Sequence, residues 1–293
     1  MNLWQHYLRP KNVEEALAGL AAAPGPARPI AGGTDLLLDL KQGNQPPLDT
    51  LVDLTTIPEL NALEIRADRL FIGAAVPLSH IVASPLVQAN AQALIEAAQL
   101  VGGPQVRNTA TLGGNVVHAL PAADGTISLM VLDCQAEIAG PQGRRKLPVG
   151  ALFLGPGKSA VDSTHEIVVG FHLPVRKPGQ ASAFRRIMRA QGIALPILNV
   201  SVWLERKAQV IQDVRIAVGP GGPTPWRAAL AEQSLRGQAY SSEAFAIARE
   251  AVLKKAGFRT SAYRASAEYR THLVGTLLQE CFETAWKRAE MDQ

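Results

Sequence analysis

Two short segments of the chain combine paired glycines with small polar side chains, and together they could surround an anionic ligand. The first is PIAGGTDL at residues 29–36, and the second is TLGGN at residues 111–115. Paired glycines let the backbone turn tightly and bring N–H groups close to a ligand, while Thr, Asp and Asn add polar side chains. If the two segments face each other, they predict a pyrophosphate site of dinucleotide size. Taken singly, either segment could be only a tight turn.

Other motifs for nucleotide binding or catalysis are incomplete. Gly157, Lys158 and Ser159 look like the end of a P-loop, but Leu152 stands where that motif needs glycine, and Pro156 removes a backbone N–H. The chain contains no Gly-x-Gly-x-x-Gly, no Gly-x-Ser-x-Gly and no His-Glu-x-x-His sequence. We therefore expect no Rossmann site, no catalytic triad and no metal centre in this chain.

The cysteines and the charge exclude further classes. Cys134 and Cys281 are far apart in the sequence and belong to no Cys/His cluster, so this chain alone should not hold an iron–sulfur cluster. We expect reduced thiols in a cytoplasmic protein. The 29 basic and 25 acidic residues leave a net charge of only +4, which favours neither nucleic-acid binding nor a membrane surface. No apolar stretch predicts a signal peptide or membrane insertion.

The elements around the first glycine segment can be predicted from local patterns. A helix should begin at Asn12, with Glu15 completing a capping box. A short strand at 28–31 precedes the glycines, and Thr34 or Asp35 could cap a helix over 36–41. This strand, glycine turn and helix order would direct backbone N–H groups at a ligand above the turn. Further strands are expected at 51–54, 70–74 and 166–173, and helices at 87–100 and 127–132.

A linker over 174–180, which holds two prolines and a glycine, predicts a domain boundary. Beyond it, alternating apolar and polar residues predict a three-stranded antiparallel sheet at 183–188, 198–204 and 210–218. Helices are expected at 226–235, 241–255 and 263–288. Apolar residues make up 47% of the chain, which is enough to form real cores.

The chain resembles the FAD-binding medium subunit of the molybdenum hydroxylases, which include aerobic carbon monoxide dehydrogenase, bacterial xanthine dehydrogenase and 4-hydroxybenzoyl-CoA reductase. The resemblance covers nearly the whole chain. It is carried by PIAGGTDLLLDLK, LVDLTTIPEL, FIGAAVPLSHI, VGGPQVRNTATLGGNVVHALPAAD, FLGPGKSA, EIVVGFHLP, FRRIMRAQGIALPILNVSV, RIAVGPGGPTPWRA and SAEYR.

The resemblance implies an α+β fold in two parts. Residues 1–176 would form an FAD-binding domain of the vanillyl-alcohol-oxidase (PCMH) type, with subdomains at about 1–57 and 58–176. Residues 177–293 would form a smaller α+β domain of the carbon monoxide dehydrogenase flavoprotein type, with a three-stranded antiparallel sheet and helices.

The resemblance also implies roles for individual residues. Residues 29–36 would line the pyrophosphate and ribityl chain of FAD, with 111–115 opposite and Asp124 at the adenosine end. Arg185 falls where relatives have a lysine near the flavin, and Arg186 is a further candidate whose alternative is a solvated strand edge. A cation there would favour the reduced flavin. The implied contacts are Pro29, Ile30, Ala31, Gly32, Gly33, Thr34, Asp35, Leu36, Ile72, Thr111, Leu112, Gly113, Gly114, Asn115, Asp124, Val168 and Arg185.

The function implied by the resemblance is electron transfer within a larger complex. Electrons would leave a substrate at a molybdopterin in a large subunit, cross [2Fe–2S] clusters in a small subunit and reach FAD in this chain. An external acceptor such as NAD or a quinone would then receive them, in an assembly expected to be a dimer of heterotrimers. Two alternatives stay open: a self-sufficient flavin oxidase or dehydrogenase of the same fold class, and a scaffold that has lost its flavin.

Overall fold

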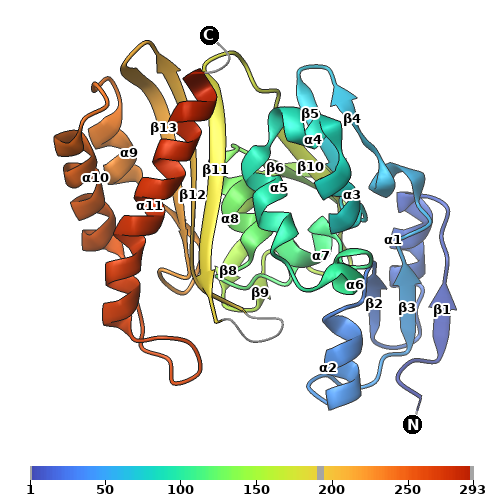
Figure 1. Cartoon of the computed structure of the whole chain (residues 1–293). Helices are drawn as coiled ribbons and strands as arrows, with labels where there is room; N and C mark the ends of the chain where they lie inside the picture. Colours follow the sequence, from blue (N-terminus) through green and yellow to red (C-terminus); the bar gives the residue numbers. More distant parts are fainter. Residues whose placement is uncertain (1, 190–194, 291–293) are drawn as a thin grey trace.

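The first of three layers is a small parallel sheet with two helices (Figure 1). The computed structural model describes residues 2–189 and 195–290, so residues 190–194 of the FRRIMRAQGIALPILNVSV segment and residues 291–293 lie outside the described part. The strands β1 (His6–Leu8), β2 (Ala27–Ile30) and β3 (Thr50–Asp53) are parallel, in the order β1-β3-β2. The helices α1 (Val13–Ala21) and α2 (Leu36–Gln42) form the two crossovers.

The capping box predicted for the first helix is confirmed. The Glu15 backbone N–H donates to Asn12 Oδ1 over 2.8 Å, and Asn12 Nδ2 donates to Glu15 Oε1 over 3.0 Å. Asn12 therefore ends an extended stretch and starts α1, whose buried residues Val13, Ala16 and Leu20 face the neighbouring sheets.

The middle layer is a five-stranded antiparallel sheet in the order β4-β5-β10-β6-β7. One face contacts α1, and helices cover the other face. The strands are β4 (Leu63–Arg66), β5 (Arg69–Gly73), β6 (Gln135–Gly140), β7 (Gly143–Pro148) and β10 (Ile167–Pro174). The helices are α3 (Leu78–Ala83), α4 (Pro85–Asn90), α5 (Gln92–Gln99), α6 (Pro104–Arg107), α7 (Leu112–Val117) and α8 (Asp124–Val131). The shorter elements are η1 (Pro58–Asn61), η2 (Val149–Leu152), β8 (Phe153–Gly155) and β9 (Lys158–Ser159).

The helix expected over 87–100 is two helices. Ala91 adopts φ −145° and ψ 56°, which is not helical, and it separates α4 from α5. Ala91 is fully buried, and Ala93 N–H donates to the Ser182 hydroxyl over 3.1 Å across to the third layer. Tertiary packing thus overrides a local preference that favoured one continuous helix.

The third layer is an antiparallel sheet with helices α9 (Ala229–Leu235), α10 (Ser242–Lys255) and α11 (Ala267–Glu290). Its strands are β11 (Gln180–Met188), β12 (Pro196–Lys207), β13 (Val210–Gly219) and β14 (Trp226–Arg227). The prediction of three strands missed β14, which takes residues expected to begin a helix and pairs with Ala217 and Val218. A two-residue strand is too short to show alternation in the sequence.

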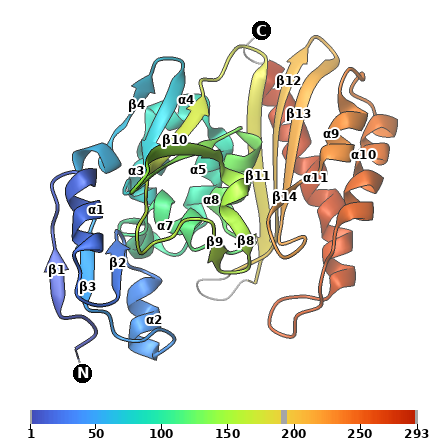
Figure 2. The same ribbon diagram turned by 180° about the vertical axis from the view of Figure 1, so that it is seen from behind.

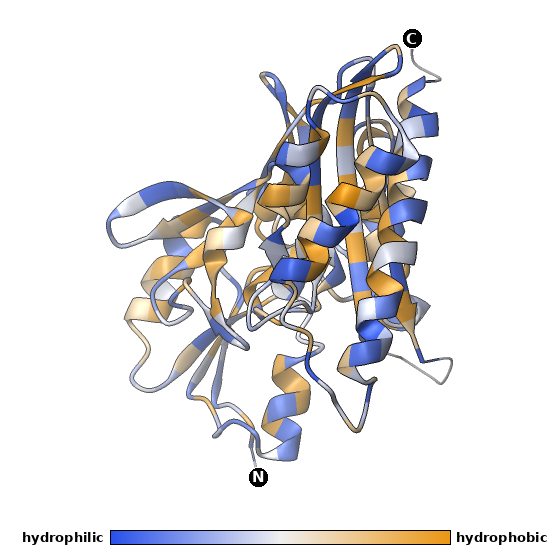
Figure 3. Cartoon of the chain, turned by 90° about the vertical axis from the view of Figure 1, so that its left-hand side faces the viewer, coloured by the Kyte–Doolittle hydropathy of each residue, from blue (hydrophilic) through white to orange (hydrophobic). Residues whose placement is uncertain are grey.

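The third sheet is covered on both faces. The long helix α11 crosses β11 and β12 on the outer side, while α5 and α8 of the middle layer pack against the other side (Figure 2). Leu277 and Cys281 of α11 lie in the core of the third layer, whereas Tyr269 is 46% exposed. Figure 3 shows hydrophobic and hydrophilic residues alternating around the turns of the helices. Within residues 2–189 and 195–290, no helix is both long and apolar enough to cross a membrane.

Candidate functional site

The first glycine segment presents a run of free backbone donors. It leaves the end of β2 and enters α2, and Gly33 adopts a φ of +66°, which suits glycine. The backbone N–H groups of residues 31–35 make no hydrogen bond within the described part of the chain. Unpaired N–H groups at the start of a helix are suited to bind an anion. Asp35 does not cap α2 with its side chain, because its own backbone is already helical.

The second glycine segment is the start of a helix rather than a turn. Thr111 is the N-cap of α7, and its hydroxyl accepts from Gly114 N–H over 3.1 Å. The N–H groups of Leu112 and Gly113 donate to the carbonyls of Val76 and Ala74. Our expectation that both segments offer free backbone donors is therefore wrong for this one. Its N–H donors bond to the Thr111 hydroxyl and to carbonyls of the loop that follows β5, and Gly113 allows close packing on Ala74.

The first glycine segment lies against Thr109 and Ala110, which directly precede the second segment. A Cβ atom added to Gly32 would collide with the carbonyl oxygen of Thr109 and would lie 2.9 Å from Ala110 Cα. A Cβ atom added to Gly113 would lie 2.6 Å from the carbonyl oxygen of Ala74. Both positions thus require glycine because backbone approaches backbone. The tertiary structure brings residues 29–36 and 111–115 to one place, although about 80 residues separate them in the sequence.

A hydrogen bond connects the second glycine segment to the helix that begins at Asp124. Asn115 Oδ1 accepts from the Gly125 N–H over 3.2 Å, which joins α7 to the first turn of α8. Asp124 is 4% exposed and forms an ion pair with Arg186 of β11. Asn199 of β12 donates from Nδ2 to Asp124 Oδ1 over 2.8 Å. Asp124 therefore sits where the middle layer meets the third.

The environment of Asp124 is strongly polar but shielded from water. Burial raises the pKa of Asp124 to about 6, against the opposing effect of Arg186 and Asn199. Arg186 also donates to the Leu100 carbonyl oxygen over 2.5 Å. Two buried atoms of this cluster, Arg186 Nε and Asn199 Oδ1, have no hydrogen-bond partner among the described residues. They are one donor and one acceptor that a bound polar group could satisfy.

The adjacent arginines of β11 point to opposite faces of the sheet. Arg185 contacts Thr284 of α11 over 3.2 Å and Glu96 of α5 over 3.2 Å. Arg186 points to Asp124, and its side chain is only 5% exposed. The alternative of a solvated strand edge for Arg186 is therefore wrong. Strand alternation could have shown that the two residues differ in direction, but not which one meets the carboxylate.

The two predicted apolar contacts lie inside the middle layer. Ile72 is fully buried in β5, and Val168 is 5% exposed in β10. Both belong to the core between the five-stranded sheet and its helices. Their contact with a cofactor stays a prediction, as does that of Arg185.

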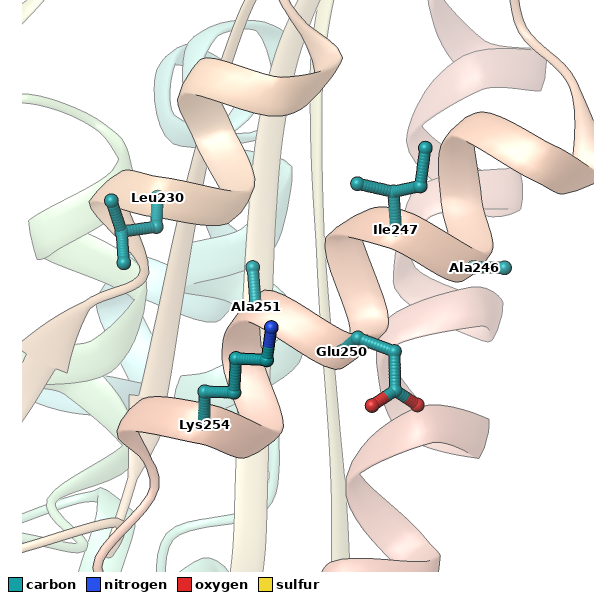
Figure 4. A pocket seen from close by; sticks show the side chains of 6 residues that line it. All are labelled: Leu230, Ala246, Ile247, Glu250, Ala251 and Lys254. Atoms are coloured by element: carbon teal, nitrogen blue, oxygen red, sulfur yellow. The ribbon is translucent and has the colours of Figure 1, made fainter.

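An apolar cavity of about 460 Å³ opens on the outer surface between α9 and α10 (Figure 4). None of the predicted site residues lines it. The residues around it are Leu230, Ala246, Ile247, Glu250, Ala251 and Lys254.

The comparisons with known proteins agree along the whole chain. Residues 3–176 match the family described as FAD binding domain in molybdopterin dehydrogenase, and residues 182–285 match the C-terminal domain of carbon monoxide dehydrogenase flavoprotein. The chain therefore belongs to this family of FAD-binding oxidoreductase subunits.

Individual relatives agree with this assignment. The carbon monoxide dehydrogenase medium chain of Hydrogenophaga pseudoflava is 30% identical over 96% of this chain and 97% of its own length. A putative xanthine dehydrogenase FAD-binding subunit of Escherichia coli is 31% identical over 95% of each chain. A solved structure of the Hydrogenophaga carbon monoxide dehydrogenase superposes with a TM-score of 0.91 over 98% of this chain and 99% of that chain. The structure of quinoline 2-oxidoreductase from Pseudomonas putida 86 superposes with a TM-score of 0.88 at 25% sequence identity, over 97% of this chain and 98% of that chain.

The cofactor of this family is FAD, and the residues present fit it. The free N–H groups of residues 31–35 suit a pyrophosphate, and the absence of a side chain at Gly32 lets this segment pack directly on the backbone of Thr109. Beside the buried carboxylate of Asp124, Arg186 Nε and Asn199 Oδ1 have no hydrogen-bond partner among the described residues. FAD carries polar groups at both its diphosphate and its sugar.

Proposed function

We propose that this chain is the FAD-binding electron-transfer subunit of a heteromeric molybdenum hydroxylase. It would receive electrons from [2Fe–2S] clusters in a small partner subunit, after substrate oxidation at the molybdopterin of a large subunit. It would then pass them to an external acceptor. Bound FAD supplies the redox chemistry, so the chain itself needs only to bind, orient and shield it.

The observation that carries this proposal is the series of unpaired backbone N–H groups at residues 31–35, close to the second glycine segment. The N–H groups of residues 31–35 would hold the pyrophosphate, with Thr111 to Asn115 opposite. The helix start at Leu36 adds a favourable dipole for the negative charge. Asp124, fixed by Arg186 and Asn199, would hold the adenosine end. Ile72 and Val168 are proposed as apolar contacts and Arg185 as the cation toward the flavin.

The proposed partners follow from the relatives and from the cysteines. Two relatives are named as a medium chain and as an FAD-binding subunit, which indicates assembly with other subunits. Cys134 lies in the core of the middle layer and Cys281 in that of the third layer, so the two thiols do not meet. We propose that the iron–sulfur clusters belong to the small subunit, in a cytoplasmic dimer of heterotrimers.

We also propose a division of the chain into two domains. Residues 1–176 would form the FAD-binding domain, with subdomains at about 1–57 and 58–176, and residues 177–293 the C-terminal domain. The division is supported by separate sheets, because no strand pairing joins the first, second and third layers within the described residues.

One experiment tests the function. The chain is purified alone, its visible spectrum is recorded, and candidate substrates are added with and without co-expressed large and small subunits. We expect a flavin spectrum and no substrate-dependent reduction until both partners are present. Reduction by substrate in the isolated chain would instead support the self-sufficient oxidase. Absence of flavin, even after reconstitution with FAD, would support the scaffold.

A further inference from the structure

Arg270 is a buried cation without a counter-charge. It lies in the first turn of α11 and is only 5% exposed. Its Nε atom is buried without a hydrogen-bond partner, and no hydrogen bond or ion pair reaches its guanidinium from the rest of the described chain. An uncompensated buried charge strongly destabilises a fold. This arginine therefore offers an anion a shielded guanidinium that no acidic residue of the described chain neutralises.

Other shielded arginines of the chain have such a partner. Arg186 pairs with Asp124, and Arg206 reaches Glu290 over 3.4 Å. Arg227, whose side chain is 30% exposed, also has an acidic partner and donates to Glu232 over 2.7 Å. Arg270 therefore differs from these arginines, because no acidic residue of the described chain pairs with it.

The surroundings of Arg270 are positive. Burial lowers the pKa of Arg270, and the charges of Arg264 and Arg259 lower it further. Glu268, the acidic residue of the same turn, is exposed and forms no ion pair with Arg270. The N-terminal end of a 24-residue helix also has a positive dipole, which disfavours a cation and favours an anion.

Two hydrogen bonds shape the loop before α11, which carries Arg259 and Arg264. The Thr260 hydroxyl accepts from the Ala267 N–H over 3.1 Å, and Ser261 N–H donates to the Ala265 carbonyl over 3.0 Å. Arg259 is exposed, whereas Arg264 is half-buried. The cations therefore run from solvent to the buried guanidinium, which would guide an anion inward.

We propose that Arg270, Arg264 and Arg259 form an oxyanion-binding site at the start of α11, which accepts a phosphate or a carboxylate group. Guanidinium groups bind both oxyanions through paired N–H donors. The group could belong to a free ligand or to an acidic side chain of another subunit. The second source rests on the proposed assembly, while the site itself is independent of FAD.

The first test measures thermal unfolding of the full chain in chloride and in inorganic phosphate at equal ionic strength. We expect phosphate to raise the Tm of the wild type by about 2 °C or more, and to have no such effect on Arg270→Met. In chloride alone, Arg270→Met should melt higher than the wild type, because it removes an unpaired buried charge. Arg249→Gln is the control, since Arg249 is exposed and pairs with Glu250 over 3.6 Å.

The second test measures assembly with co-expressed partner subunits for Arg270→Met, Arg264→Gln and Arg249→Gln. If Arg270→Met and Arg264→Gln lose the phosphate-induced rise in Tm but assemble normally, the oxyanion belongs to a free ligand. Assembly lost in those variants alone, without a phosphate effect, assigns a partner's carboxylate. Equal responses to phosphate and chloride with normal assembly would overturn the site. If Arg270→Met does not fold, the same measurements are made on Arg264→Gln. An unchanged flavin content in the variants shows that the result concerns the oxyanion site and not the proposed FAD site.

Discussion

At the scale of single residues, Gly33 and Gly43 allow a matched comparison. Both have positive φ values, +66° and +74°, on either side of α2. A Cβ atom on Gly43 would meet nothing within 4 Å, whereas one on Gly33 would lie 3.0 Å from Ile30 Cδ1. The backbone strain of a substitution should therefore be similar at the two sites, and only its effect on the glycine segment should differ.

We expect Gly33→Val to abolish FAD retention and Gly43→Val to preserve it. Each variant should lose roughly 1–2 kcal/mol of stability, because valine is strained in the left-handed region. The measurement is the flavin-to-protein absorbance ratio after gel filtration, beside urea unfolding. Normal flavin content in Gly33→Val would contradict the role proposed for residues 31–35.

Asp124 should make stability depend on pH. Its folded pKa of about 6 lies above the ~3.9 of an unfolded aspartate, so the folded chain binds the extra proton between these values. Its contribution to the free energy of unfolding must therefore fall as the pH rises through this window. The fall should be at most roughly 3 kcal/mol.

The variant Asp124→Asn should lack this dependence. It leaves Arg186 without a counter-charge, so we expect it to be less stable than the wild type. The difference in free energy of unfolding between the wild type and Asp124→Asn should shrink from about pH 4 to about pH 7, as measured by urea unfolding. A difference that stays constant or grows with pH would count against the shielded environment of Asp124.

At the scale of elements, the start of α1 depends on local hydrogen bonds. Asn12→Ala removes both bonds of the capping box and should lower the free energy of unfolding by about 1 kcal/mol. Asn44→Ala is the control, because Asn44 Nδ2 bonds only to the exposed side chains of Asp39 and Gln42. Flavin content should stay normal in both variants. Equal stability of the two would show that α1 does not depend on its cap.

The two glycine segments show how far an element can be predicted locally. The strand, glycine and helix order around Gly32 follows from neighbouring residues and is present in the structure. At Gly113, the same kind of sequence starts a helix whose N–H groups are already used. Thr111 decides the difference, since its hydroxyl caps α7, and the carbonyls of Ala74 and Val76 accept the remaining bonds.

At the scale of the whole molecule, Glu96 joins the middle and third layers. This carboxylate of α5 accepts from Phe184 N–H over 2.7 Å and from Arg288 over 2.5 Å. The ion pair of Asp124 with Arg186 and the hydrogen bond from Ala93 N–H to the Ser182 hydroxyl are further polar contacts between the same two layers. Polar contacts of this kind fix the orientation of packed layers.

We expect Glu96→Gln to loosen the packing of the third layer on the middle layer. The variant keeps the size of the side chain but loses its charge toward Arg288 and Arg185. Limited proteolysis near residues 175–180 should become faster, by about tenfold for each 1.4 kcal/mol lost. Glu283→Gln is the control, because Glu283 of α11 bonds only to Gln279. Equal cleavage rates would mean that Glu96 does not hold the layers together.

Features that depend on near neighbours can be predicted from residue order alone. The cap at Asn12, the glycine before α2 and the alternating strands of the third layer are set by bonds and backbone preferences within a few residues. The resemblance of long segments also determined the family and its cofactor, FAD, because these follow from residue order.

Which distant groups meet is set by the packing of the three layers. It placed Gly32 against Thr109, turned Arg186 rather than Arg185 toward Asp124, and broke a helix at Ala91. It also left Arg270 buried without an acidic partner in residues 2–189 and 195–290. Each of these depends on contacts between residues far apart in the chain, where packing and the cost of burying charge outweigh local preference.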